Sequence, residues 1–138
     1  MNRKVLLYID DDPEDMEFFR EAVRMVDPSC LCVGARNGQE GLELLATLTP
    51  DLIFLDINMP VMNGKETLES IQVDNRLNKL PVFMLSTTTN PREREVFRKL
   101  GAKACLIKPN SFDALCDTLR NFLQEVPSEN LQRGGYTS

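Results

Sequence analysis

Short apolar runs alternate along this chain with longer segments in which apolar residues recur every three or four positions. The short runs have the length and composition of buried strands, and the longer segments have the period of amphipathic helices. The predicted strands cover residues 4–9, 30–35, 51–55, 82–85 and 104–107. Because helical segments separate the strands, the pattern predicts an α/β fold with a doubly wound parallel sheet and helices on both faces.

Capping residues place the helices between these strands. Asp12 is a good N-cap, and Pro13 suits the first position of the helix that follows. Asn37 with Glu40 resembles a capping box at the start of the second helix. The remaining helices are expected to begin near Asn63, Asn90 and Ser111. In the fourth helix, the spacing predicts that Val96, Phe97 and Leu100 face the core.

Length and composition fit one domain. The 138 residues are 42% hydrophobic, which is enough for one ordinary core. Residues 127–138 include Gly134-Gly135 and lack apolar periodicity. We therefore expect one domain over residues 1–126 and a disordered tail over residues 127–138.

Charge and the length of the apolar runs exclude several classes of partner. The chain has 21 acidic and 16 basic residues and a net charge of −5, which disfavours binding to nucleic acid or anionic membranes. The apolar runs are far shorter than the roughly 20 residues of a membrane-spanning helix. The first residues show no signal-peptide pattern. We therefore expect a cytoplasmic protein with no nucleic-acid and no membrane partner.

The four cysteines and the absence of histidine limit the chemistry further. No C-x-x-C pair is present, and no histidine can complete a zinc site. The cysteines are therefore interpreted as reduced thiols. Without histidine, Ser-His-Asp and Cys-His catalysis are excluded, and carboxylates, hydroxyls and lysines remain for any reaction.

Side chains that can bind ions or phosphate lie at the carboxyl ends of four predicted strands. The first strand ends in Asp10-Asp11 and the third in Asp56. The fourth ends in Ser86-Thr87 and the fifth in Lys108. Ligands of open α/β sheets bind at this edge, so we expect these groups to converge on one crevice.

The charges of this group predict a divalent cation. Three carboxylates and one lysine sum to −2, which one Mg²⁺ brings to zero. Mg²⁺ typically binds one or two carboxylates together with water and phosphate oxygens. The crevice therefore suits a phosphoryl group near Asp56, whose carboxylate can form an acyl phosphate stabilised by Lys108 and a serine hydroxyl.

Several motifs together resemble the receiver domain of two-component response regulators, the family of the bacterial chemotaxis regulator. They are Leu6-Leu7-Tyr8-Ile9-Asp10-Asp11-Asp12-Pro13, Leu55-Asp56-Ile57-Asn58-Met59-Pro60, Asn63-Gly64, Met84-Leu85-Ser86-Thr87 and Lys108-Pro109. They occur in family-like order and spacing across residues 4–125. The resemblance implies a flavodoxin-like sheet of order 2-1-3-4-5.

The resemblance also implies roles in phosphorylation. Asp56 matches the phosphoacceptor, Lys108 the lysine that pairs with the phosphoryl group, and Ser86 the switch hydroxyl. It further implies a cis peptide bond between Lys108 and Pro109. One position departs from the family, which often has Tyr or Phe where this chain has Cys105. We therefore expect a smaller change on the output surface than is usual in the family.

A metal site is implied by the same resemblance. Asp11 and Asp56 match direct ligands of Mg²⁺ or Mn²⁺, and the backbone carbonyl of Asn58 matches the third protein ligand. Asp10 matches the acid that reaches the metal through water.

The leading interpretation is a phosphoacceptor module of a two-component phosphorelay. It takes a phosphoryl group from a histidine kinase or a histidine phosphotransfer protein and signals to an unknown downstream protein. It turns over no separate substrate, so it is not expected to be an enzyme. We expect a monomer or a weak homodimer that uses the surface of the fourth helix, fifth strand and fifth helix.

Three alternatives stay open at this point. A phosphatase of the haloacid dehalogenase type has a D-x-D pattern after the first strand, whereas this chain has Asp56-Ile57-Asn58 after the third. A flavin-binding domain needs a Ser/Thr/Gly-rich phosphate loop after the first strand. A degenerate receiver that only binds lacks part of the acid, hydroxyl and lysine set. A P-loop nucleotidase is excluded because no G-x-x-x-x-G-K-[ST] motif is present.

Overall fold

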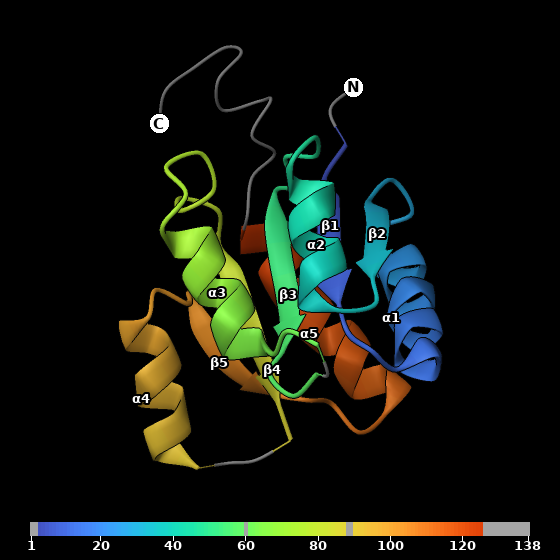
Figure 1. Cartoon of the computed structure of the whole chain (residues 1–138). Coiled ribbons are helices and arrows are strands. Elements are labelled where there is room, and N and C mark those ends of the chain that lie inside the picture. The colour runs from blue at the N-terminus through green and yellow to red at the C-terminus, as the bar shows by residue number, and fades with distance from the viewer. Residues whose placement is uncertain (1–2, 60, 88–89, 126–138) are drawn as a thin grey trace.

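Five parallel strands form one sheet in the computed structural model, which describes residues 3–59, 61–87 and 90–125 (Figure 1). The strands are β1 (Val5–Ile9), β2 (Leu31–Ala35), β3 (Leu52–Asp56), β4 (Val82–Ser86) and β5 (Ala104–Ile107). Their order across the sheet is β2-β1-β3-β4-β5. This confirms the predicted flavodoxin-like fold, and it places β3 at the centre with its carboxyl end beside those of β1 and β4.

Helices cover both faces of the sheet. They are α1 (Pro13–Val26), α2 (Gly38–Leu45), α3 (Gly64–Gln72), α4 (Pro91–Lys99) and α5 (Phe112–Glu125). One buried cluster joins α1 and α5 to one face, and a second joins α2, α3 and α4 to the other. The crossovers predicted from the alternation of strands and helices are therefore present.

The central strands supply residues to both clusters. Every residue of β3 and of β4 is buried, as expected of strands covered on both faces. Phe54 and Phe83 face α1 and α5 with ring centroids 5.2 Å apart, whereas Leu55 and Met84 face the other helices. Because the central strands are held on both sides, the side chains at their carboxyl ends have a fixed platform.

The predicted cap of α1 and the predicted start of α3 are confirmed, and the predicted cap of α2 is confirmed in part. The Asp12 side chain accepts hydrogen bonds from the backbone amides of Glu14 and Asp15, with Pro13 following as predicted. Asn63 forms a complete capping box with Glu66. Asn37 accepts from the Glu40 amide, but the Glu40 carboxylate accepts from the Arg36 amide, so the expected reciprocal bond to Asn37 is replaced.

Two further expectations were wrong. Val96 of α4 is 46% exposed rather than directed to the core, because α4 presents one narrow row, centred on Phe97, to the sheet. The Lys108-Pro109 peptide bond is trans, since no described peptide bond is cis. Trans is the intrinsically favoured form before proline. The predicted tail over residues 127–138 lies outside the described residues.

No helix within the described ranges combines the length and apolar character needed to cross a membrane.

Candidate functional site

Asp56 is the last residue of β3 and lies at the carboxyl edge of the sheet. Asp56 pairs with Leu85 of β4, and the Ile57 amide continues this pairing by donating to the Leu85 carbonyl at 3.1 Å. Asp56 is 5% exposed. The central position of β3 therefore fixes the backbone of Asp56 and buries most of its carboxyl group.

Gly64 allows the chain to return closely to Asp56 after the β3–α3 loop. Its amide donates to the Ile57 carbonyl at 2.9 Å. A Cβ atom at this position would lie 2.6 Å from the Asp56 carbonyl oxygen, closer than real Cβ contacts. The Asn63-Gly64 motif thus combines a helix cap with a close backbone approach, which explains its value at this site.

Three carboxylates meet at this edge, as the sequence predicted. One oxygen each from Asp10, Asp11 and Asp56 lies within 4.8 Å of the other two. Asp10 is buried, whereas Asp11 is exposed. Both follow β1, whose pairing with β3 brings them beside Asp56.

Asp10 is held by a set of local hydrogen bonds. Its Oδ1 accepts from the Asp12 amide at 3.0 Å. Its Oδ2 accepts from the Tyr8 hydroxyl, which comes from within the aromatic core, where Tyr8 stacks on Phe19 at 3.9 Å. Burial and the neighbouring Asp10 carboxylate raise the pKa of Tyr8, so this hydroxyl keeps its proton and remains a donor.

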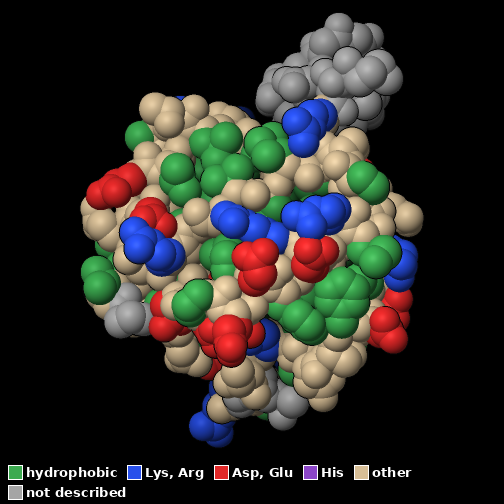
Figure 2. Space-filling view, turned by 90° about the vertical axis from the view of Figure 1, so that its right-hand side faces the viewer, with side chains coloured by type: hydrophobic (Ala, Val, Ile, Leu, Met, Phe, Trp, Pro, Cys, Tyr) green, Lys and Arg blue, Asp and Glu red, His purple; other side chains and the backbone are tan. Residues whose placement is uncertain are grey.

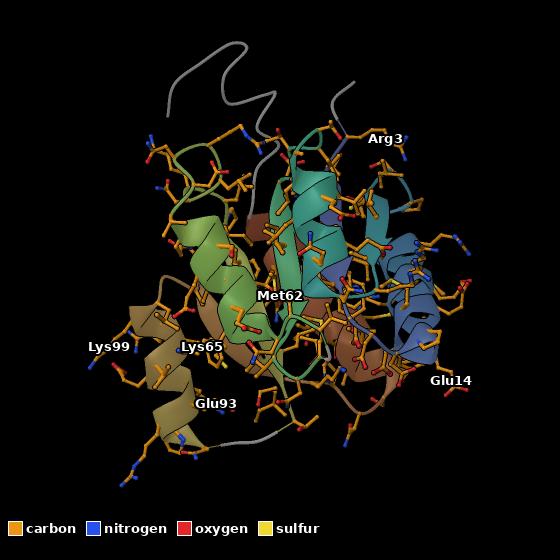
Figure 3. The ribbon with its side chains drawn as sticks, viewed as in Figure 1. Arg3, Glu14, Met62, Lys65, Glu93 and Lys99 are labelled. Carbon is orange, nitrogen blue, oxygen red and sulfur yellow. The ribbon has the colours of Figure 1, made fainter. Side chains whose placement is uncertain are left out.

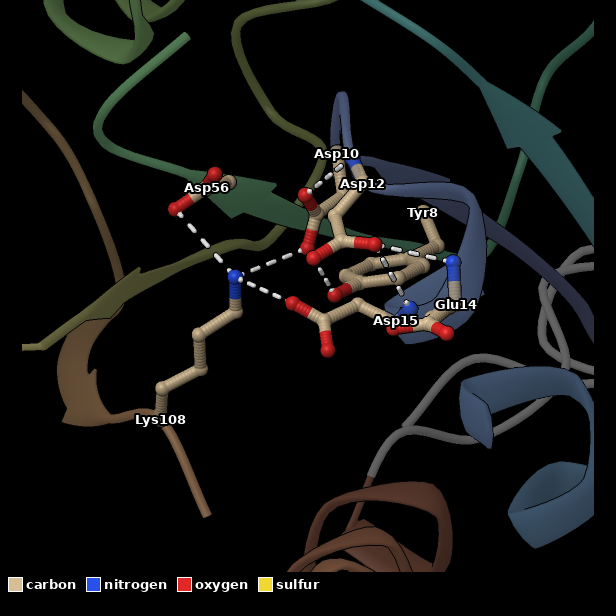
Figure 4. A network of polar contacts seen from close by, with 7 residues as sticks. All are labelled: Tyr8, Asp10, Asp12, Glu14, Asp15, Asp56 and Lys108. Atoms are coloured by element: carbon tan, nitrogen blue, oxygen red, sulfur yellow. Dashed lines mark hydrogen bonds and ion pairs between the residues drawn. The ribbon is translucent and has the colours of Figure 1, made fainter. Parts of the chain in front are cut away.

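Lys108 reaches this cluster from the end of β5. Its ammonium nitrogen lies 2.9 Å from Asp10 Oδ2, 3.0 Å from Asp15 Oδ2 and 3.8 Å from Asp56 Oδ1 (Figure 4). Burial lowers the pKa of Lys108, but the hydrogen bonds to Asp10 and Asp15 and the charges of Asp10 and Asp56 outweigh it and raise the pKa overall. Lys108 is therefore charged at neutral pH.

Asp15 is a site residue that the sequence reasoning missed. It lies in the first turn of α1, four residues after Asp11, and its carboxylate meets Lys108 at the same edge. That spacing was the available signal, but acids in a first helical turn also occur for their favourable interaction with the helix dipole.

Burial shifts the pKa of the Asp56 carboxyl group. Its pKa is raised to about 6 by burial first and by the charge of Asp10 second. The Lys108 ammonium and the backbone amide of Asn58 act in the opposite direction. Asp56 is therefore mostly ionised at neutral pH, but it is a better proton acceptor than an exposed aspartate.

Ser86 is the last residue of β4 and follows Leu85, which pairs with Asp56 of β3. It is 2% exposed, and its carbonyl accepts from the Lys108 amide at 2.7 Å. Its hydroxyl donates to Glu93 Oε1 of α4 at 2.5 Å. Sequence reasoning placed Ser86 correctly at the sheet edge but gave no indication of its bond to Glu93.

A hollow of about 350 Å³ adjoins the acids on the side of α1 and β2. Arg20, Arg36 and Glu40 line it together with Asp10 and Asp11. On the face of the molecule that carries α1 and β2, basic and acidic side chains lie next to each other (Figure 2). On this face, neighbouring charges of opposite sign offset one another.

The donor set fits a hard divalent cation. Carboxylate oxygens are the ligands of Mg²⁺, and opposite ligands of one such ion lie about 4.2 Å apart at bond lengths of about 2.1 Å. The Asp10, Asp11 and Asp56 oxygens lie within 4.8 Å of one another, so they can surround one such ion directly or through water. The amide of Asn58 lies against Asp56, and the Asn58 side chain is exposed, so this loop borders the same position.

The chain shares one domain with a set of known proteins. The family model of the response regulator receiver domain matches residues 6–120. The polar-differentiation response regulator DivK of Brucella anthropi is 28% identical over 123 residues, covering 89% of this chain and 98% of DivK. A probable cyclic di-GMP phosphodiesterase of Vibrio cholerae is 29% identical over 131 residues, covering 95% of this chain but 29% of that protein. The solved structure of a phosphorylated cyanobacterial phytochrome response regulator, RcpA, has a TM-score of 0.80 and 26% identity, covering 90% of this chain and 94% of RcpA.

Proposed function

This chain belongs to the response regulator receiver domain family, and on that premise we propose that Asp56 accepts a phosphoryl group in a two-component phosphorelay. Receiver domains are signalling modules of two-component systems. The observation that carries the proposal is the placement of a buried, ionisable carboxyl group within 3.8 Å of the Lys108 ammonium and beside two further acids. This arrangement provides a nucleophile, a counter-charge and a set of cation ligands in one place.

In the transfer, an Asp56 oxygen attacks the phosphorus of a phosphohistidine. A P–O bond forms while the P–N bond of the donor breaks, and the imidazole leaves and takes up a proton. Asp56 is suited to this role because it is mostly ionised at neutral pH and little hydrated. Hydrolysis of the acyl phosphate then returns the free carboxylate.

Lys108 and Ser86 stabilise the phosphoryl group. The Lys108 ammonium needs to move only a short distance from Asp10 and Asp15 to pair with a phosphoryl oxygen on Asp56. Ser86 follows Leu85, the residue of β4 that pairs with Asp56, so the Ser86 hydroxyl can turn to a second phosphoryl oxygen. Charge-assisted hydrogen bonds of this kind are stronger than bonds between neutral groups.

Asp11, Asp56 and the Asn58 carbonyl are the residues that would hold Mg²⁺ or Mn²⁺ directly. Asp10 would act through water, as in the family, since its Oδ2 is already shared by the Tyr8 hydroxyl and the Lys108 ammonium and its Oδ1 accepts from the Asp12 amide. When bound, the cation offsets the charges of the carboxylates and of the phosphoryl oxygens.

The partners follow from the chemistry and from the surface. The donor is a histidine kinase or a histidine phosphotransfer protein, and the output passes through protein contacts. Val96 of α4 and Ile107 of β5 are 46% and 45% exposed, so the α4–β5–α5 surface offers apolar groups to a downstream partner or a second copy. The four free thiols support a reducing, cytoplasmic setting.

Phosphorylation with a small donor tests the proposal directly. The full chain is incubated with acetyl phosphate and Mg²⁺, and the intact mass is measured before and after hydroxylamine. We expect one phosphoryl group that hydroxylamine removes, both in the wild type and in Asp117→Asn, an exposed acid on α5. Labelling of Asp56→Asn to the wild-type extent would refute the assignment.

A further inference from the structure

Glu93 of α4 forms a specific bond to the end of β4. Glu93 Oε1 accepts from the Ser86 hydroxyl at 2.5 Å, and Ser86 is almost fully buried. Glu93 is half-buried and lies on the side of α4 that faces the body of the protein, opposite to Lys99 (Figure 3). The contact therefore joins the candidate phosphorylation site to the first turn of a helix on the surface.

Cys105 borders the same carboxylate from β5. Cys105 pairs with Met84, two residues before Ser86, so both side chains are on the same face of the sheet as Ser86. Burial raises the pKa of the Cys105 thiol, and the nearby Glu93 charge adds to the effect. A thiol is small, which leaves the approach to Ser86 open to a side chain from α4.

The rest of α4 is attached to the sheet by a small apolar contact. Within the described helix, Phe97 is the one buried residue, and Val96 is 46% exposed. The hydrogen bond from Ser86 to Glu93 adds a polar contact between the first turn of α4 and the end of β4.

We propose that Glu93 is the positioning residue of the Ser86 hydroxyl and that phosphorylation of Asp56 moves this hydrogen bond from Glu93 to a phosphoryl oxygen. The inference rests on the proposed function. A serine hydroxyl has one proton to donate, so it cannot serve both acceptors at once. Phosphorylation thereby releases Glu93 and the first turn of α4, which alters the α4–β5–α5 surface without an aromatic residue at position 105.

The test measures the affinity of the full chain for beryllofluoride, a mimic of the phosphoryl group, in the presence of Mg²⁺. Titrations are followed by amide NMR. Glu93→Ala should tighten the binding about three- to tenfold, since binding no longer breaks a hydrogen bond of ordinary strength. Glu93→Gln keeps an acceptor oxygen and should lie between Glu93→Ala and the wild type.

A double-mutant cycle separates this bond from general effects of charge. In the Ser86→Ala background, Glu93→Ala should change the affinity by less than about twofold, because the two residues act through one contact. Glu95→Ala removes a neighbouring charge of the same helix and should leave the affinity near that of the wild type. In the wild type, beryllofluoride should shift the amides of Arg92, Glu93 and Arg94.

Three results would overturn the inference. The first is a beryllofluoride affinity of Glu93→Ala equal to that of the wild type. The second is an equal gain in affinity from Glu93→Ala with Ser86 and with Ser86→Ala. The third is a set of amide shifts that does not include the first turn of α4. These results leave the proposed function intact if the wild type binds beryllofluoride and Asp56→Asn does not. Failure of the wild type to bind, or equal binding by Asp56→Asn, would overturn both proposals.

Discussion

The Lys108 ammonium lies 3.0 Å from the Asp15 carboxylate, closer than its 3.8 Å separation from Asp56. In the unphosphorylated protein the lysine is therefore shared between the sheet and α1. The Asp15 side chain is 41% exposed, so water screens this ion pair and keeps it weak.

Asp15→Asn should accelerate the phosphorylation of Asp56. Without the Asp15 charge, Lys108 no longer has to leave an ion pair when it binds the phosphoryl group. A screened pair is worth at most about 1 kcal/mol, which corresponds to a rate increase of about two- to fivefold. The measurement is the initial rate with acetyl phosphate at saturating Mg²⁺.

Glu14→Gln is the matched control for Asp15→Asn, because Glu14 is an exposed acid of the same helical turn. It should phosphorylate at the wild-type rate. A slower rate for Asp15→Asn would show instead that Asp15 orients Lys108 productively.

Asp56→Asn should stabilise the metal-free protein above pH 6. The folded-state pKa of Asp56 is about 6, above its ordinary value of 3.8. Between these values the folded protein binds more protons than the unfolded chain, so its free energy of unfolding falls as pH rises through this window. One pKa unit corresponds to about 1.4 kcal/mol, so we expect a gain of about 1–3 kcal/mol for the variant at neutral pH.

Urea unfolding at a series of pH values measures this gain. It should shrink as pH falls from 6 towards 4, where the wild-type Asp56 is protonated in the folded state. Glu17→Gln, which removes an exposed acid of α1, should show no such trend. A gain for Asp56→Asn that is independent of pH would contradict a charged, buried Asp56.

Mg²⁺ should stabilise the wild type and not Asp11→Asn. Binding to the folded state alone contributes about 2.7 kcal/mol at a hundredfold excess of the ion over its dissociation constant. Removal of the exposed Asp11 carboxylate leaves too few ligands beside Asp56. Thermal unfolding with and without Mg²⁺ provides the measurement, with Asp117→Asn as the control. An Asp11→Asn shift as large as that of the wild type would exclude this metal site.

Gly64→Ala should disturb both the fold and the site. The added Cβ meets backbone atoms of Asp56 and Ile57 at 2.6–2.7 Å, and backbone cannot yield as a flexible side chain can. We expect a loss of about 1–3 kcal/mol in the free energy of unfolding, together with slower phosphorylation of Asp56.

Gly34→Ala provides the comparison for Gly64→Ala. Its Cβ would meet the side-chain ends of Met16 and Arg20, which can move. Its cost should therefore be clearly smaller. Equal costs for the two variants would mean that the β3–α3 loop adjusts readily.

The sequence by itself determined most of the side chains that meet at the carboxyl ends of the strands. Apolar runs with two-sided burial predict a parallel sheet, and a parallel sheet brings the carboxyl ends of its strands to one edge. The convergence of Asp10, Asp11, Asp56 and Lys108 follows from this geometry alone. The cap formed by Asp12 and Pro13 was equally readable, because it depends on residues within one helical turn.

The tertiary structure alone decided how the site groups are paired. Asp15 meets Lys108, and Glu93 meets Ser86, because the packing of α1 and α4 sets their rotation and distance from the sheet. Periodicity predicted an inward Val96, yet the narrow contact of α4 leaves it exposed. A repeat of three or four residues defines a face of a helix, but it does not fix how much of that face the sheet covers. Pairings between helices and strand ends depend on that coverage, which arises only when the whole core is packed.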